Sequence, residues 1–194
     1  MGVAPPPPLL QVLRRAWDNE GYTATLPYLR EVATRAATAE GSILECGSGV
    51  TTIVLGALAG RRGVAVHTLE HDPAWRDRVA ELLQRYRIPG VHLHLAPIID
   101  RGAFDWYEVP KGSWPDEFGF VVCDGPPGDT KGGRYGLLPV LGARLRPGSI
   151  ILLDDATRPG EMAVRRRWRA EREVRERVEH GPDRGYAVLT LGST

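Results

Sequence analysis

The sequence predicts an α/β domain in which a mostly parallel sheet carries helices on both faces and ends in an antiparallel hairpin. Short apolar runs alternate with helical stretches from about residue 43 onward, a pattern typical of parallel sheets. The last quarter of the chain instead ends in two apolar runs joined by glycine, proline and aspartate, which is typical of a hairpin. At 194 residues the chain has the length of one such domain rather than two.

Two helices are expected before the sheet. Apolar residues recur at helical spacing in the first, at Leu9, Leu10, Leu13, Ala16 and Trp17. The second covers residues 26–39 and ends before Gly41. Residues 1–8 contain four consecutive prolines and are expected to form a stiff lead-in, which leaves residues 9–194 as a single domain.

The apolar runs predict the strands, and the segments between them predict the covering helices. Strands are expected at residues 43–45, 64–70, 91–95, 118–123 and 150–153, with a final hairpin of residues 174–178 and 186–191. Helices are expected at residues 51–58, 74–86, 137–145 and 160–170.

Composition excludes several classes of protein. The formal net charge is +1, which gives no global field to attract nucleic acid or an anionic membrane. No apolar run approaches the roughly 18 residues of a membrane span. The two cysteines, Cys46 and Cys123, lie in a glycine loop and an apolar strand, which does not suggest a disulfide framework. The N-terminus lacks the basic-then-apolar order of a secretory signal, so we expect a cytoplasmic protein without a membrane partner.

The first strand runs into a glycine loop that carries its own carboxylate. Gly47 and Gly49 follow the strand at the place where open parallel sheets bind ligands, and Glu45 stands just before them. A dinucleotide fingerprint would require a third glycine where this chain has Thr52, and a carboxylate would not favour a pyrophosphate. S-adenosylmethionine carries an ammonium and a sulfonium, so the loop favours that cofactor.

Glu70 ends the next strand and is a second indication of the same cofactor. An acidic side chain there accepts hydrogen bonds from both ribose hydroxyls of a nucleoside. The alternative is that the glycines merely turn the chain and that Glu70 is a solvated strand end. Next to it, His71 and Asp72 are candidates to line the ribose or adenine site, or else they start the following helix, with Asp72 as its cap.

Three stretches resemble the class I S-adenosylmethionine-dependent methyltransferase superfamily. They are LECGSGVTT at residues 44–52, LEHD at 69–72 and VCDGPPG at 122–128, and the similarity spans about residues 22–192. The resemblance implies a Rossmann-like, doubly wound sheet of seven strands. It also implies cofactor contacts from Glu45, Gly47, Ser48, Gly49, Val50, Thr51, Glu70, His71 and Asp124. The adenine contact after the third strand, often an acidic or amide side chain, falls here on Ala96.

Acidic residues follow two further strands of the predicted sheet. Asp124 follows one strand, and Asp154 with Asp155 follows the next, so all three should meet at one rim. Clustered carboxylates repel one another unless they are protonated or neutralised, and a divalent cation such as Mg²⁺ is a common solution. The pattern resembles catechol-type and macrolide-sugar O-methyltransferases, which bind magnesium with equivalent residues. The alternative is that Asp155 caps a helix and Asp154 is solvated.

Three residues are candidates for the catalytic group. In the catechol type a lysine lies close behind the first aspartate, and here Lys131 is the nearest lysine after Asp124. Without a metal, Asp124 or His71 would serve as general base. The long aromatic segment 101–117, with Trp106 and Tyr107, is expected either to form a lid over the acceptor or to pack on the domain surface.

These patterns together favour methyl transfer from S-adenosylmethionine to a hydroxyl of a small molecule or sugar, with or without Mg²⁺. Methyltransferases that act on nucleic-acid bases carry Asp-Pro-Pro-Tyr, whereas here Gly125 separates Asp124 from the prolines. The arginine run 165–169 is surrounded by glutamates, which indicates a solvated helix face. The alternatives are a nucleic-acid or protein methyltransferase, a non-catalytic module that binds S-adenosylmethionine, and a nucleotide-dependent oxidoreductase. We expect a small-molecule partner, and a homodimer is compatible with the sequence.

Overall fold

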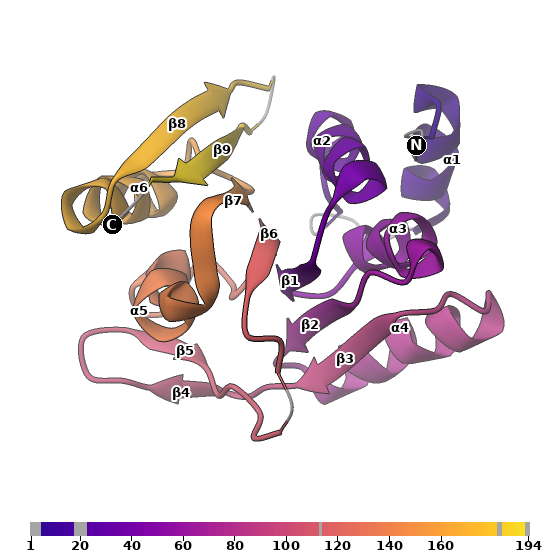
Figure 1. Ribbon diagram of the computed structural model, residues 1–194, viewed down its shortest axis with the longest axis horizontal. Helices are drawn as coiled ribbons and strands as arrows, with labels where there is room; N and C mark the ends of the chain where they lie inside the picture. The colour runs from indigo at the N-terminus through magenta and orange to yellow at the C-terminus, as the bar shows by residue number, and fades with distance from the viewer. Residues whose placement is uncertain (1–4, 18–22, 113, 182–183, 193–194) are drawn as a thin grey trace.

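The computed structural model describes residues 5–17, 23–112, 114–181 and 184–192 (Figure 1). Its helices are α1 (Pro7–Trp17), α2 (Leu26–Thr38), α3 (Val50–Leu58), α4 (Pro73–Arg85), α5 (Leu137–Leu141) and α6 (Pro159–Glu171), with 3-10 turns η1 (Gly60–Arg62), η2 (Gly133–Gly136) and η3 (Gly142–Arg144). Its strands are β1 (Ser42–Cys46), β2 (Val66–Glu70), β3 (Val91–Leu95), β4 (Ile98–Asp100), β5 (Asp105–Tyr107), β6 (Phe118–Cys123), β7 (Leu145–Leu153), β8 (Val174–Glu179) and β9 (Tyr186–Leu191). None of the helices in these ranges is both long and apolar enough to cross a membrane.

The main sheet confirms the predicted topology. Within the described ranges it has seven strands in the order β3-β2-β1-β6-β7-β9-β8. The first five of these strands are parallel to one another, while β9 pairs antiparallel with both β7 and β8. The order reverses beside β1, so the carboxyl ends of β1 and β6 flank the crevice in which such sheets bind ligands.

Two hydrophobic cores cover the two faces of this sheet, as the alternation of buried side chains along the strands requires. One core joins α1, α2, α3 and α4 to one face and includes Val32, Val54 and Val79. The other joins α5, α6 and the β4–β5 hairpin to the opposite face and includes Leu137 and Trp168. The ribbon shows the same layers, with α2 and α3 on one side and α5 on the other (Figure 1).

Local sequence explains the two turns that matter most for the site. Gly47 has a φ of +85°, and a Cβ atom added there would lie 3.0 Å from the backbone nitrogen of Gly125. Only glycine fits this left-handed turn between two touching strand ends. Asp72 caps α4, because its carboxylate accepts a hydrogen bond of 3.0 Å from the backbone nitrogen of Trp75.

The structure departs from the predicted elements in three places. Helix α1 begins at Pro7, inside the expected lead-in, of which residues 1–4 lie outside the described part. The predicted helix 137–145 is α5 followed by η3, and its last residue already begins β7. The segment expected as a long loop contains β5, which pairs with β4 in a small antiparallel sheet. Strands of three residues are too short to leave a periodic signal in the sequence.

Candidate active site

A large cavity lies beyond the carboxyl ends of the central strands. Its volume is about 1120 Å³, which exceeds the usual range for a single small ligand and leaves room for a cofactor and an acceptor together. Residues that follow β1, β2, β6 and β7 line it, and so do the start of α6 and Arg184 just before β9. We call the part near the β1 and β2 ends the cofactor end and the part near the β6 and β7 ends the acceptor end.

The glycine loop and Glu70 form the cofactor end. The expected loop residues Gly47, Ser48, Gly49, Val50 and Thr51 all line the cavity. The Glu70 carboxylate accepts hydrogen bonds from the Ser48 hydroxyl at 2.7 Å and the Ser48 backbone nitrogen at 2.9 Å. Its other oxygen accepts from the backbone nitrogens of His71 and Asp72. Glu70 therefore both lines the cavity and fixes the shape of the loop.

Hydrogen bonds decide the ionisation of Glu70. Burial alone would raise the pKa of its carboxyl, but the hydrogen bonds from His71, Asp72 and Ser48 lower that pKa below its ordinary value. The His71 Nδ1 atom lies 3.0 Å from the same carboxylate, and this contact raises the pKa of His71. His71 lines the cavity beside Glu70, on the cofactor side.

Glu45 lies beneath the loop rather than in the cavity wall. Its side chain is fully buried, and one oxygen accepts hydrogen bonds of 2.7 Å from the hydroxyls of Thr52 and Thr68. The other oxygen, Oε1, has no hydrogen-bond partner among the described residues. Burial raises the pKa of this carboxyl to about 7. The structure thus places Glu45 one layer behind the residues that face the cavity.

Two aromatic residues complete the cofactor end, and the sequence had given neither a cofactor role. The indole nitrogen of Trp75 donates to the backbone oxygen of Ser48 at 2.9 Å, and its ring lines the cavity. Tyr107 also lines the cavity, is fully buried, and has a hydroxyl without a partner among the described residues. Because buried hydroxyls are usually hydrogen-bonded, the Tyr107 hydroxyl is suited to bind a polar group of a ligand in the cavity.

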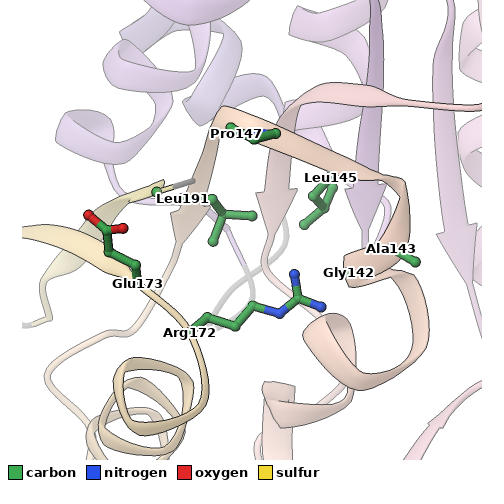
Figure 2. A pocket seen from close by; sticks show the side chains of 8 residues that line it. Gly142, Ala143, Leu145, Pro147, Arg172, Glu173 and Leu191 are labelled. Atoms are coloured by element: carbon green, nitrogen blue, oxygen red, sulfur yellow. The ribbon is translucent and has the colours of Figure 1, made fainter. Parts of the chain in front are cut away.

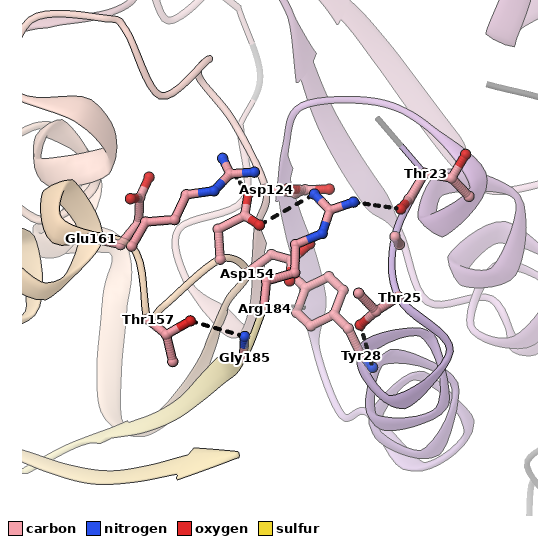
Figure 3. Close-up of polar contacts among 12 residues, drawn as sticks. Thr23, Thr25, Tyr28, Asp124, Asp154, Thr157, Glu161, Arg184 and Gly185 are labelled. Atoms are coloured by element: carbon pink, nitrogen blue, oxygen red, sulfur yellow. Dashed lines mark hydrogen bonds and ion pairs between the residues drawn. The ribbon is translucent and has the colours of Figure 1, made fainter. Parts of the chain in front are cut away.

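The acceptor end brings Asp124, Asp154 and Asp155 together, as the order of the strands predicts. One oxygen of each lies within 4.8 Å of the others. Figure 3 shows Asp124 and Asp154 in one close-up with Arg184 and Glu161. The Arg184 guanidinium lies 3.3 Å from Asp155 and donates to the backbone oxygen of Thr23 at 3.5 Å, which ties β9 to the segment before α2.

Arg134 lies in the middle of this acidic cluster. Its side chain is only 3% exposed, and its Nη2 atom lies 3.1 Å from Asp124 Oδ1 and 3.2 Å from Asp155 Oδ2. Its guanidinium also donates to the backbone oxygens of Asp124 and Asp154. Arg158 adds a third cation, 2.9 Å from Asp155 Oδ2. The buried carboxylate of Glu161 lies 4.0 Å from Arg134 Nε, so three arginines face four carboxylates at this end of the cavity.

The expected magnesium site does not fit this arrangement. The carboxylates are close enough to share an ion, but Mg²⁺ requires oxygen ligands at about 2.0–2.1 Å in an octahedron. Both oxygens of Asp155 and one oxygen of Asp124 already face guanidinium groups. A divalent ion bound to those oxygens would lie against the buried charge of Arg134. We therefore derive no chemical step from a metal.

Burial and mutual repulsion make two of these aspartates more basic than usual. Burial, the charge of Asp154 and that of Asp155 raise the pKa of Asp124 well above its ordinary value, although Arg134 opposes the shift. Burial and the charge of Asp155 raise the pKa of Asp154 to about 6. The Asp124 side chain is 26% exposed to the cavity, so it can reach a bound acceptor.

Several residues predicted from the sequence do not reach the cavity. The Lys131 ammonium is exposed and donates to the backbone oxygen of Gly102 on the β4–β5 hairpin. Ala96 is fully buried, and its backbone nitrogen donates to the Glu70 carbonyl. Trp106 belongs to the second core and packs against Gly136, so the lid expected from this residue is not formed. In the arginine run, Arg166, Arg167 and Arg169 are exposed, as a solvated helix face requires, but Arg165 is largely buried against Glu176.

A second, much smaller hollow of about 170 Å³ lies near the start of β7 (Figure 2). Arg172, Glu173, Leu145 and Leu191 line it. Because β7 begins there, this hollow is at the opposite end of the sheet from the carboxyl ends of the parallel strands. No residue predicted to act on a ligand contacts it.

Comparisons with solved structures show which fold the chain shares. A putative O-methyltransferase from Klebsiella pneumoniae superposes with a TM-score of 0.63 at 17% identity, covering 98% of this chain and 93% of that one. The O-methyltransferase from Bacillus cereus, in complex with SAH, gives 0.60 at 15% identity, covering 95% and 90%. The METTL16 methyltransferase domain gives 0.66 at 12% identity, covering 96% and 80%. The fold is that of the class I methyltransferases.

The family follows from the sequence itself. The family model described as "Methyltransferase domain" (Methyltransf_24) matches residues 44–156, more than half of the chain. The protein belongs to this family and is an S-adenosylmethionine-dependent methyltransferase. A search of curated protein sequences finds no match to the chain.

Proposed function

We propose that this methyltransferase transfers the methyl group of S-adenosylmethionine to a hydroxyl oxygen of a small polar acceptor, with Asp124 as general base. The observation that carries the proposal is the position of Asp124. It stands at the acceptor end of the cavity, directly before Gly125, whose backbone touches Gly47 of the cofactor loop. The two solved structures named as O-methyltransferases are consistent with it.

The chemistry requires a base and correct positioning more than covalent help. The cofactor, when bound, supplies an electrophilic methyl group. A hydroxyl becomes a good nucleophile as it loses its proton, and a carboxylate whose pKa is raised is a stronger base than an ordinary one. Asp124 would take that proton, and the walls around it would hold the oxygen in line with the methyl group.

We assign the other site residues by their place in the cavity. Gly47, Ser48, Gly49, Val50, Thr51 and Glu70, with His71 beside them, would contact the cofactor. Glu45 would act indirectly, by holding Thr52 beneath the loop. Asp155 would shape the acceptor end through its arginine partners, and Asp154 through its backbone oxygen, which accepts from Arg134. Lys131 is not part of this assignment, because its ammonium lies against the β4–β5 hairpin and does not line the cavity.

The lining of the acceptor end favours a small polar acceptor over nucleic acid. A surface that binds phosphates presents unpaired basic side chains. Here Arg134, Arg158 and Arg184 all lie against the carboxylate of Asp155. The acceptor end therefore presents arginines that are already paired together with carboxylate oxygens, which suit hydroxyl groups. A cytoplasmic location and a homodimer stay predictions from the sequence.

Methyl transfer from S-adenosylmethionine labelled in its methyl group tests the proposal. The wild-type chain is incubated with three acceptor panels: hydroxylated small molecules including sugars, oligonucleotides and a protein extract. We expect label in an alkali-stable methyl ether of a small molecule. With the acceptor that becomes labelled, the Asp124→Asn variant should transfer the methyl group about 10²–10⁴-fold more slowly than the wild type. The variant should still bind S-adenosylhomocysteine with unchanged affinity.

Asp129→Asn is the matched control, because Asp129 also lines the cavity but is exposed. It should keep most of the activity. Label found only in oligonucleotides or protein would refute the choice of acceptor. A fully active Asp124→Asn variant would refute the choice of base.

A further inference from the structure

Arg134 occupies the place in the acceptor end where a cation is needed. Three carboxylates converge there, each with one oxygen within 4.8 Å of the others. Bringing such groups together in a buried site is unfavourable unless a positive charge lies between them. The Arg134 guanidinium contacts Asp124 and Asp155 at 3.1 and 3.2 Å and also hydrogen-bonds the backbone at the ends of β6 and β7.

The burial of Arg134 makes this charge permanent. Its side chain is 3% exposed, and the surrounding carboxylates raise the pKa of its guanidinium further above its ordinary value, in spite of the burial. An arginine does not lose its proton in any case. Unlike a metal ion, this cation cannot dissociate, and η2, which carries it, packs against α6 and β5.

We infer that Arg134 is the built-in cation of the acceptor site and that this protein needs no metal there. The guanidinium offsets the negative charge of the aspartates and aligns them, for which related folds can use a divalent metal. The inference rests on the proposed function only in naming this end of the cavity as the acceptor end. Arg134 is a positioning residue: it holds Asp124 in place and sets the charge around it.

The contacts of Arg134 predict what its removal would do to the three aspartates. Without the Arg134 guanidinium, the remaining ion pairs of the cluster would be those of Arg158 and Arg184, and both are made with Asp155. Asp124 would then have no cationic partner among the described residues. Three oxygen ligands with surplus negative charge are the set that a divalent cation prefers. Removal of Arg134 should therefore create a metal site that the native protein lacks.

Titration with Mn²⁺ alone, followed by electron paramagnetic resonance of the free ion, tests this without any acceptor. The full-length wild type, with and without S-adenosylhomocysteine, should bind no Mn²⁺ at this site. Arg134→Met keeps the length of the side chain but not its charge, and it should bind one Mn²⁺ at least tenfold more tightly than the wild type. That binding should disappear in the double variant Arg134→Met/Asp155→Asn.

Arg158→Met is the matched control, because Arg158 also contacts Asp155 but is 46% exposed and does not touch Asp124. It should bind no more Mn²⁺ than the wild type. Stoichiometric Mn²⁺ binding by the wild type that is lost in Asp155→Asn would overturn the inference. So would a folded Arg134→Met variant that binds no Mn²⁺.

If Arg134→Met does not fold, the titration of the wild type still tests whether the native site binds a metal. Arg134→Lys, which retains one positive charge, should fold and bind no Mn²⁺. A failure of the proposed function looks different. In that case methyl transfer to hydroxyl acceptors is absent, whatever the result with Mn²⁺.

Discussion

Glu45 should couple the stability of the fold to pH. Its pKa is about 7 in the folded chain against an ordinary value of 4.5. Between these values the folded chain holds a proton that the unfolded chain has released, so the free energy of unfolding falls as the pH rises from about 4.5 to 7 and then levels off. The size of this effect is on the order of 3 kcal/mol, because each pKa unit corresponds to about 1.4 kcal/mol.

The Glu45→Gln variant should lose that part of the pH dependence. Urea unfolding at pH 5 and pH 8 measures it, and the difference between the two pH values should be smaller in the variant than in the wild type. Asp154 shifts in the same direction, so some dependence should persist in the variant. An unchanged pH dependence would show that Glu45 titrates normally.

Glu70 should matter for the cofactor through its charge. It accepts bonds from Ser48 and the backbone of the following turn, and Gln at this position cannot accept all of them. Glu70→Gln is expected to weaken binding of S-adenosylhomocysteine by at least about tenfold, since a hydrogen bond to a charged group contributes roughly 1.5–3 kcal/mol. Calorimetric titration checks this, and Glu81→Gln, an exposed Glu of α4, should bind normally.

The structural role of some site residues could be predicted from the sequence, and that of others could not. Glu70 and the Asp72 cap follow from their immediate neighbours in the chain, so both could be predicted. Glu45 was expected to face the cofactor, but the hydroxyls of Thr52 and Thr68 hold it in the layer below. The role of Arg134 depends on η2 lying over two strand ends, and no local pattern encodes that contact.

The turn between β1 and α3 is expected to be disturbed by any side chain at Gly47. Gly47→Ala would suffer both from the left-handed backbone and from contact with Gly125. Gly41→Ala is the matched control, because Gly41 has a φ of +75° but nothing within 4 Å of an added Cβ. Both variants should lose stability, by about 1–2 kcal/mol for the backbone strain alone.

Only Gly47→Ala should also lose affinity for S-adenosylhomocysteine, by at least about tenfold in a calorimetric titration. Equal losses in both variants would mean that the loop matters only for folding. The contact between Gly47 and Gly125 would then have no special role in the binding of the cofactor.

The main strands and helices were predictable because each has a strong pattern of its own. The β4–β5 hairpin was not, since its strands have three residues each, and β5 ends in Trp106 and Tyr107, which the hairpin buries. From the sequence alone, aromatic residues in a charged segment are compatible with a lid on the protein surface. Their burial follows from tertiary contact with Gly136 and Gly125, which lie far along the chain.

For the whole molecule, cofactor binding should raise the melting temperature. A ligand at a hundred times its dissociation constant stabilises the folded state by about 2.7 kcal/mol, and for a chain of this size that corresponds to roughly 5–10 °C. Differential scanning fluorimetry with S-adenosylhomocysteine measures the shift. NAD at the same concentration should give none, because the loop has Thr52 where a dinucleotide fingerprint has glycine.

The position of β9 in the sheet affects the order in which the two ends of the cavity form during synthesis. The loop, Glu70 and Trp75 leave the ribosome early, whereas β9 is made after β7 and β8, between which it must insert. Until residue 191 emerges, β7 has an unpaired edge and Arg184 is not held against Asp155. A nascent chain should therefore complete its acceptor end last, and its exposed β7 edge is the place where we expect chaperones to bind.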